Sequence, residues 1–234
     1  MRPDELDAAV RARPVAFVPL GSLEFHSAHL PIGLDALTAH GVCVGAAHRG
    51  GGVVLPALHQ GTGGGHTAYP WTVMMPTGDE LKAVLATTLN RLQEFGFRVA
   101  VVFTGHFSHE QLALVDDVAR SWNDENVGLR VLAAGVNRCP TAPVPPDHAG
   151  VFETSLLYAL RPELVDIGRL PDRTAHPSHD PAGNVIGPQR HDPAHPLWGV
   201  FGPDPRDFDT TAAGPLLQTL VDWLDTSAAE ALRR

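Results

Sequence analysis

The sequence has few cysteines and no long apolar run. Its two cysteines, Cys43 and Cys139, lie far apart in unlike contexts, which argues against a disulfide or a thiolate metal site. No stretch of about 18 apolar residues is present, so we expect no membrane-spanning helix. The N-terminal segment lacks the apolar core and the small-residue cleavage site of a signal peptide. We therefore expect a cytoplasmic protein.

Basic residues are also scarce, with 17 Lys and Arg against 26 Asp and Glu and a net charge of −9. No Lys/Arg cluster interleaved with aromatic residues occurs, so nucleic acid is a poor candidate partner. Histidine is abundant by contrast, with 13 residues. Because histidine is the commonest metal ligand and carries protons near neutral pH, the positions of these residues point to the function.

Short apolar runs alternate with helical patterns along the 234 residues, a length that suits one domain with its own core. We expect strands at 15–20, 52–58, 99–104 and 129–134. Helices are expected over 81–92 (with a capping-box-like Thr77-x-x-Glu80 before it and Gly96 after it), 109–122, 150–160 and from 211 onward. This alternation predicts a single α/β domain over 1–234. We expect a three-layer α/β/α fold with a mainly parallel central sheet. Ligands of such a fold bind beyond the carboxyl ends of the strands.

The segment from about 172 to 209 is rich in Pro, Gly, His and Asp and lacks periodicity. We expect a long ordered loop or flap there. Its four histidines, most of them next to proline, fit a solvated loop better than a metal-binding tract; they are His176, His179, His191 and His195.

The first predicted strand leads into a polar loop that contains Glu24, His26, His29 and Asp35. Glu24 and His26 are two residues apart, so in an extended segment their side chains point the same way. Asp35 would close the loop near the start of the next helix. Two carboxylates and an imidazole would form half of a two-metal site for Zn²⁺ or Mn²⁺. Taken singly, each residue has a simpler reading: a helix cap for Asp35, a solvated carboxylate for Glu24 and a loop hydrogen-bonder for His26.

Two further polar turns can face this loop. His106 follows the strand at 99–104, and the turn at 146–155 contains His148 and Glu153. Glu153 and His148 are five residues apart and could reach the same cleft. A glutamate buried in an apolar helix start is costly without a partner, and a cation would supply one.

Together these segments resemble the creatininase family. That family has a Gly-Ser-x-Glu-x-His-x-x-His-Leu-Pro-x-x-x-Asp run, a strand ending in Asn-Gly-His-Gly-Gly-Asn and a His-Ala-Gly-x-x-Glu-Thr-Ser turn. This chain has GSLEFHSAHLPIGLD at 21–35, TGHFSH at 104–109 and HAGVFETS at 148–155, with a weaker match in GGGHTAYPWTVMMPTGDEL at 63–81. The matches follow the family's order over most of the chain.

The resemblance implies a metal-dependent amidohydrolase that cleaves a C–N bond of a small cyclic or linear amide, using a water that bridges two divalent ions. Zinc is the first candidate metal, with manganese or iron as alternatives. It also implies a homo-oligomer, often a hexamer. The resemblance also implies a role for each site residue. One ion would be held by Glu24, Asp35 and His106, and the second by His26 and the bridging Asp35. Glu153 would be the remaining carboxylate of the metal and catalytic site, and His148 would handle protons at the scissile amide.

The chain departs from the family pattern at two places. In creatininases a ligand glutamate stands two residues after the strand-end histidine, where this chain has Ser108; His109 or Glu110 could compensate. In the weakly matching segment at 63–81, the family has a Glu-His pair where this chain has Gly65-His66, so the substrate contacts have changed. The glycine run at 61–65 would let the backbone pass close to a substrate. We expect three side chains to line the substrate pocket: His29, His66 and Trp71.

Two other functions are compatible with parts of this pattern. A non-catalytic creatininase-like protein that binds a ligand or supports an assembly would hold metal weakly or at one site. A phosphate- or dinucleotide-binding domain is suggested by the glycine run, but the run lacks the G-x-G-x-x-G order before a helix and the downstream acid that contacts the ribose.

Overall fold

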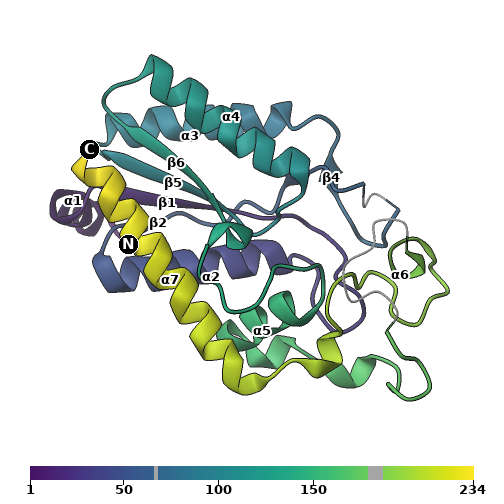
Figure 1. Ribbon diagram of the computed structural model, residues 1–234. Coiled ribbons are helices and arrows are strands. Elements are labelled where there is room, and N and C mark those ends of the chain that lie inside the picture. Colours follow the sequence, from purple (N-terminus) through teal and green to yellow (C-terminus); the bar gives the residue numbers. More distant parts are fainter. Residues whose placement is uncertain (66–67, 179–186) are drawn as a thin grey trace.

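The computed structural model describes residues 1–65, 68–178 and 187–234. Its centre is a parallel four-stranded sheet in the order β2-β1-β5-β6 (Figure 1). The strands are β1 (Val15–Leu20), β2 (Val53–Val54), β5 (Val99–Thr104) and β6 (Arg130–Gly135). All residues of β1 and β5 are buried, as expected of central strands covered on both faces. The two strands pair in register, so that their carboxyl ends, Leu20 and Thr104, lie side by side.

Helices cover both faces of this sheet, which confirms the α/β fold with a mainly parallel central sheet (Figure 1). One face packs against α3 (Asp79–Glu94) and α4 (His109–Glu125). The other packs against α2 (Leu34–Gly50), α5 (Val151–Leu160) and α7 (Thr210–Arg233). The remaining elements are α1 (Pro3–Ala12), β3 (Gly61–Thr62), β4 (Met74–Met75), α6 (Pro188–His191) and four 3-10 turns at 136–138, 162–164, 167–169 and 205–207.

The period-two alternation of the strands divides the core between the two faces. Val15 and Phe17 of β1 pack with α2 and α7, whereas Ala16, Val18 and Leu20 pack with α3 and α4. Helix α3 contributes its expected stripe of buried leucines, Leu81, Leu85, Leu89 and Leu92.

Two elements differ from the sequence prediction. The strand expected at 52–58 forms a ladder with β1 only over Val53–Val54. The nitrogen of Leu55 still donates to the carbonyl oxygen of Phe17, but Pro19 of β1 has no N–H to continue the ladder, and pairing resumes at Leu58, which bridges to Leu20. Helix α1 was not predicted. Its apolar residues Leu6, Ala9 and Val10 have helical spacing and pack on the core, but the helix is short and none of its residues is fully buried.

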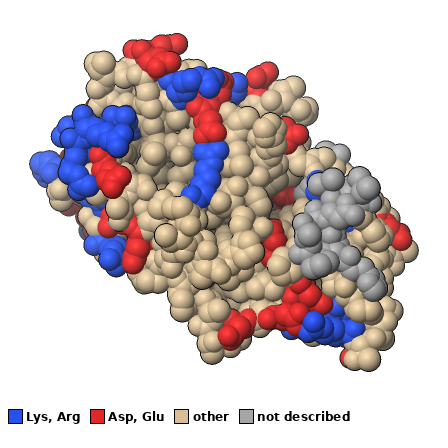
Figure 2. Space-filling model, in the orientation of Figure 1, with Lys and Arg blue, Asp and Glu red and all other residues tan. Residues whose placement is uncertain are grey.

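Charge is mixed on the surface. On the face in Figure 2, Lys and Arg gather mainly toward the end of the molecule that carries α1 and both termini, and acidic side chains lie among them. Within the described ranges, no helix combines the length and the apolar character needed to cross a membrane.

Candidate metal centre

The polar loops meet where β1 and β5 end, against the first turn of α2. Two glycines allow this contact. A Cβ added at Gly21 would lie 2.1 Å from the backbone nitrogen of Ala36, and one added at Gly105 would lie 2.0 Å from the carbonyl oxygen of Asp35. The strand ends therefore touch the backbone of α2 directly, and this contact places Asp35 at the carboxyl edge of the sheet.

Five ionisable side chains are buried together at this edge. Glu24 and His26 are fully buried, Asp35 is 1% exposed, Glu153 3% and His106 5%. Taking so many ionisable groups out of water costs several kcal/mol unless they are paired or bind a cation. The sequence-predicted ligands therefore come together in one buried cluster.

Asp35 is shared between two groups of potential ligands. Its Oδ2 lies 3.4 Å from Nδ1 of His106, which also lies 2.9 Å from Oε2 of Glu24. Its Oδ1 lies 3.2 Å from Nε2 of His26, which lies 3.4 Å from Oε2 of Glu153. In each group, Glu24–Asp35–His106 and His26–Asp35–Glu153, the ligand atoms all lie within 4.8 Å of one another.

The hydrogen bonds around the cluster orient its members. Nδ1 of His26 contacts the carbonyl oxygen of Glu24 at 3.0 Å, and Nε2 of His106 contacts the carbonyl oxygen of Thr62 at 3.2 Å. Such contacts leave the other ring nitrogen directed at the cluster, as in metal-binding histidines. The hydroxyl of Ser22, which the sequence analysis missed, donates to both Asp35 and Glu24. Its position two residues after the end of β1 was the available signal.

The buried nitrogen of His26 tests whether a cation fits. Nε2 faces two carboxylates but has no hydrogen-bond partner among the described atoms. A lone pair aimed at two carboxylates is unfavourable, so this nitrogen requires a proton or a metal ion. Carboxylate oxygens and imidazole nitrogens suit Zn²⁺ and Mn²⁺. The residues therefore fit a pair of divalent ions.

In the protein without metal, the histidines and carboxylates of the cluster shift one another's pKa values. Burial alone would lower the pKa of His106, but Glu24 and Asp35 outweigh it and raise that pKa to about 10. Burial opposes the charge on His26 as well, yet Asp35 and Glu153 raise its pKa well above the ordinary value. Burial would raise the pKa of Asp35, but His26 and His106 hold it below its usual range. A metal ion would replace these protons.

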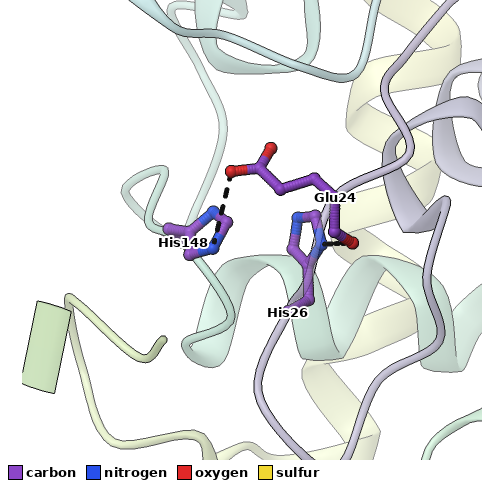
Figure 3. A group of neighbouring side chains, drawn as sticks. All are labelled: Glu24, His26 and His148. Atoms are coloured by element: carbon purple, nitrogen blue, oxygen red, sulfur yellow. Dashed lines mark hydrogen bonds and ion pairs between the residues drawn. The ribbon is translucent and has the colours of Figure 1, made fainter. Parts of the chain in front are cut away.

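His148 lies beside Glu24 and His26 (Figure 3) and lines the cavity described below. Its Nε2 lies 3.9 Å from Oε1 of Glu24 and 3.2 Å from the carbonyl oxygen of Phe25. Its ring packs against that of His26, with centroids 4.4 Å apart. Glu24, His26 and His148 form a third group whose ligand atoms lie within 4.8 Å of one another, so His148 is within reach of an ion as well as of the cavity.

Asp147 is a second residue that the sequence analysis missed. Its carboxylate accepts hydrogen bonds from the backbone nitrogens of Gly150 at 3.1 Å and Phe152 at 2.8 Å, which fixes the start of α5. Burial and the nearby Glu153 raise the pKa of Asp147 to about 8. An Asp just before a predicted helix was a signal for this capping role. Glu153 is oriented in turn by the backbone nitrogen of Ala149, at 2.7 Å.

A cavity of about 460 Å³ opens onto the cluster and contacts Asp35, His106, His148 and Glu153. Ser108 lines it too, but its hydroxyl donates to the carbonyl oxygen of Thr62 and caps α4. His109 and Glu110 lie exposed at the rim, and neither belongs to a potential ligand group in the described part of the chain. His176, His191 and His195 likewise belong to no potential ligand group in the described part of the chain. His179 lies outside the described residues.

Three residues were expected to line the substrate pocket, and the structure describes two of them, His29 and Trp71. Trp71 is 83% exposed in a turn with positive φ and is not among the described residues that line the cavity, so its place in a substrate pocket stays a prediction. His29 is also absent from that lining; it is buried, and its Nε2 lies 3.1 Å from the hydroxyl of Thr154. His66 lies outside the described residues. Residue type and loop position could not reveal these orientations.

Known proteins match the chain along nearly its whole length. The Creatininase family model, described as creatinine amidohydrolase, matches residues 1–226. Creatinine amidohydrolase of Pseudomonas putida is 30% identical over 239 residues, which cover 91% of this chain and 82% of that protein. The mycofactocin precursor peptide peptidase of Mycolicibacterium smegmatis is 30% identical over 159 residues, 65% of this chain and 60% of that protein.

Solved structures share the fold. A crystal structure of creatinine amidohydrolase is 25% identical, with a TM-score of 0.79 over 100% of this chain and 96% of that chain. A mutant creatininase of the Zn-Zn type is 24% identical, with a TM-score of 0.78 over 100% of this chain and 97% of that chain.

Proposed function

This chain belongs to the creatininase family of metal-dependent amide hydrolases, and we propose that it cleaves the C–N bond of a small cyclic or linear amide with two divalent ions that share Asp35. The observation that carries the proposal is the division of Asp35 between two buried ligand groups. Zinc is the first candidate metal, as in the Zn-Zn form of the related structure, with manganese or iron as alternatives.

Glu24, Asp35 and His106 would hold one ion, and His26, Asp35 and Glu153 the other. Glu153 matches the glutamate of the family's His-Ala-Gly-x-x-Glu-Thr-Ser turn, and its Oε2 lies 3.4 Å from Nε2 of His26. The glutamate that Ser108 replaces therefore has no substitute among the candidate ligands of the described residues. Divalent ions bound there would polarise the amide carbonyl and lower the pKa of water to near neutrality.

The protein's own groups complete the reaction. His148 lies between the cluster and the cavity, so we assign it the proton delivered to the leaving nitrogen. Phe201 stacks on its ring with centroids 4.4 Å apart, and the backbone groups of the two residues hydrogen-bond to each other, which fixes the position of the imidazole. Ser22 hydrogen-bonds to Glu24 and Asp35 and holds both carboxylates in place.

We extend the proposal to a cytoplasmic homo-oligomer, with a hexamer as the family's common form. The exposed apolar side chains of Trp71 and Val73, on neighbouring turn and bridge positions, support a subunit contact there. Light scattering after size exclusion measures the assembly, and a monomeric mass contradicts it.

The test of the metal proposal is metal content per subunit by inductively coupled plasma mass spectrometry, beside amide hydrolysis. We expect about two ions in the wild type, fewer in His26→Ala and Asp35→Ala, and an unchanged number in the control His109→Ala, which alters only the rim. His148→Gln should retain both ions and lose about 10²- to 10⁴-fold in kcat.

A second measurement does not depend on activity. Metal ions bind neutral imidazole, so loading the metal-free protein at pH 7 should release protons from His26 and His106, close to two per subunit. Calorimetry in buffers of different ionisation enthalpy counts them. Near-zero metal that added Zn²⁺ or Mn²⁺ does not restore contradicts the proposal and favours the non-catalytic alternative.

A further inference from the structure

The cavity beside the metal centre has an uneven charge. Its acidic members are Asp35, Glu110 and Glu153, and among the described residues that line it, Arg190 of α6 is the one Lys or Arg. The proposed function does not use this arginine. An anionic substrate entering the cavity would be repelled by the carboxylates, so a cation on the wall changes which substrates can bind.

Stacked rings connect Arg190 to the metal centre. The guanidinium carbon lies 4.6 Å from the ring centroid of Phe201, the Phe201 ring stacks on His148 at 4.4 Å, and His148 packs on His26 at 4.4 Å. Arg190 thus lies three such steps from a candidate metal ligand. Contact with the aromatic face and partial burial restrict the motion of the side chain.

We propose that Arg190 binds a carboxylate of the substrate and thereby determines specificity for amides that carry an acidic group close to the scissile bond, such as N-acyl amino acids or short peptides with a free C-terminus. This inference rests on the proposed amide hydrolysis. A guanidinium recognises a carboxylate through two parallel N–H···O bonds. Arg190 lines the same cavity of about 460 Å³ as Asp35 and Glu153, so a small substrate that fills this cavity contacts both the arginine and the candidate metal ligands.

Arg190 also has a structural contact that an experiment must separate from this role. Its Nη2 donates to the carbonyl oxygen of Gly64 at 3.0 Å, and the nitrogen of the same glycine donates to Oε2 of Glu110 at 3.1 Å. Gly64 belongs to a run of three glycines with positive φ, Gly63 to Gly65, which forms part of the cavity wall. If Arg190 only held this loop, removing the Glu110 contact would have the same effect as removing Arg190.

The experiment measures binding of N-acetylglycine and N-acetylglycinamide, which differ in one carboxylate, to zinc-loaded protein by isothermal titration calorimetry. We expect the wild type to prefer the carboxylate by roughly 10-fold or more, as for hydrogen bonds between charged groups. Arg190→Gln should lose most of this preference, and Arg190→Lys should keep part of it. The control Glu110→Ala should keep or increase it, because it removes one of the carboxylates that repel an anion.

Three results overturn the inference. The first is a wild type without any preference for the carboxylate. The second is a preference that survives Arg190→Gln, which would assign it to the metal alone, and the third is an equal loss in Glu110→Ala, which would make Arg190 a positioning residue for the loop. Zinc content and amide hydrolysis are measured on the same preparation. A protein that binds zinc and hydrolyses amides without an Arg190-dependent preference contradicts this inference alone, whereas absence of zinc contradicts the proposed function and this inference with it.

Discussion

At the carboxyl end of the central sheet, Glu24, His26 and Asp35 are at most 1% exposed and face one another. At the amino end, Arg13 pairs with Asp225 at 2.6 Å, with side chains 12% and 18% exposed. Both ends thus contain ion pairs between segments distant in sequence, but at the carboxyl end Asp35 and Glu24 are each shared between two histidines, so no pair is complete by itself.

This difference separates a structural pair from a binding site. Arg13 and Asp225 satisfy each other, and Arg13 also donates to the carbonyl oxygen of Gly51. The carboxyl-end cluster leaves Nε2 of His26 without a hydrogen bond among described atoms. A buried set of charges that is complete only with an added cation is a functional arrangement, whereas a complete pair contributes to stability alone.

The largest effect is expected at Asp35. Asp35→Asn keeps the size of the side chain but removes the charge that both ligand groups share. We expect loss of both ions and a fall in kcat/KM of at least about 10³-fold, since a catalytic metal contributes several kcal/mol to the transition state. Metal analysis and kinetics measure this. Retention of two ions would contradict the sharing of Asp35.

A smaller effect is expected from Ser22→Ala. The hydroxyl donates to both Asp35 and Glu24, and groups that orient metal ligands contribute about 10- to 100-fold to metal affinity. Competition with a chromogenic chelator measures that affinity. Ser155→Ala is the matched control, because it removes a buried hydroxyl for which the described residues offer no hydrogen-bond partner. Equal affinities in the two variants would contradict the role of Ser22.

His29 should make stability depend on pH. Burial, with a contribution from His26, lowers its pKa to about 3, whereas an unfolded histidine titrates near 6.5. As the pH falls from about 6.5 toward 3, the unfolded chain takes up a proton that the folded protein does not. The free energy of unfolding should therefore fall by up to about 1.4 kcal/mol per pH unit.

Urea unfolding of the metal-free protein between pH 4 and 7 isolates this contribution. His29→Gln should flatten the dependence, because the glutamine does not titrate and can still contact Thr154. His48→Gln, which replaces an exposed histidine, serves as the control. A slope that is unchanged in His29→Gln would contradict the prediction.

The smallest effects belong to the amino end. Arg13→Gln leaves Asp225, 18% exposed, with only the longer contact to Arg49 at 3.9 Å, so we expect a loss of about 1 to 2 kcal/mol in urea unfolding with an unchanged metal content. Arg91→Gln, in an exposed pair with Glu94, should change stability by no more than about 0.5 kcal/mol. Loss of metal in Arg13→Gln would contradict the separation of the two ends.

The sequence predicted the elements whose pattern is dictated by burial on both sides. The strands at 15–20 and 99–104 have the predicted bounds, because unbroken apolar runs between turn signals leave little freedom. Helix α1 was missed although Leu6, Ala9 and Val10 recur at helical spacing, because the pattern is only ten residues long and its apolar residues are only partly buried.

The candidate site was predictable in its membership and less so in its geometry. Strand ends and a family pattern pointed to Glu24, His26, Asp35, His106 and Glu153, which the structure brings together. The approach of Glu153 to His26 depends on how α5 packs, which no local pattern encodes. The outward turn of Trp71 has the same origin, since a positive φ at a tryptophan follows from the surrounding loop.

The close contact of Gly21 and Gly105 with the start of α2 bears on which ions the centre accepts. Because no side chain separates these backbones, the carboxylate of Asp35 is positioned by the main chain and has little room to adjust. Glu24 and Glu153 reach the centre on longer side chains. A change of ionic radius, from zinc to the larger manganese, would therefore be accommodated by the two glutamates while Asp35 keeps its place.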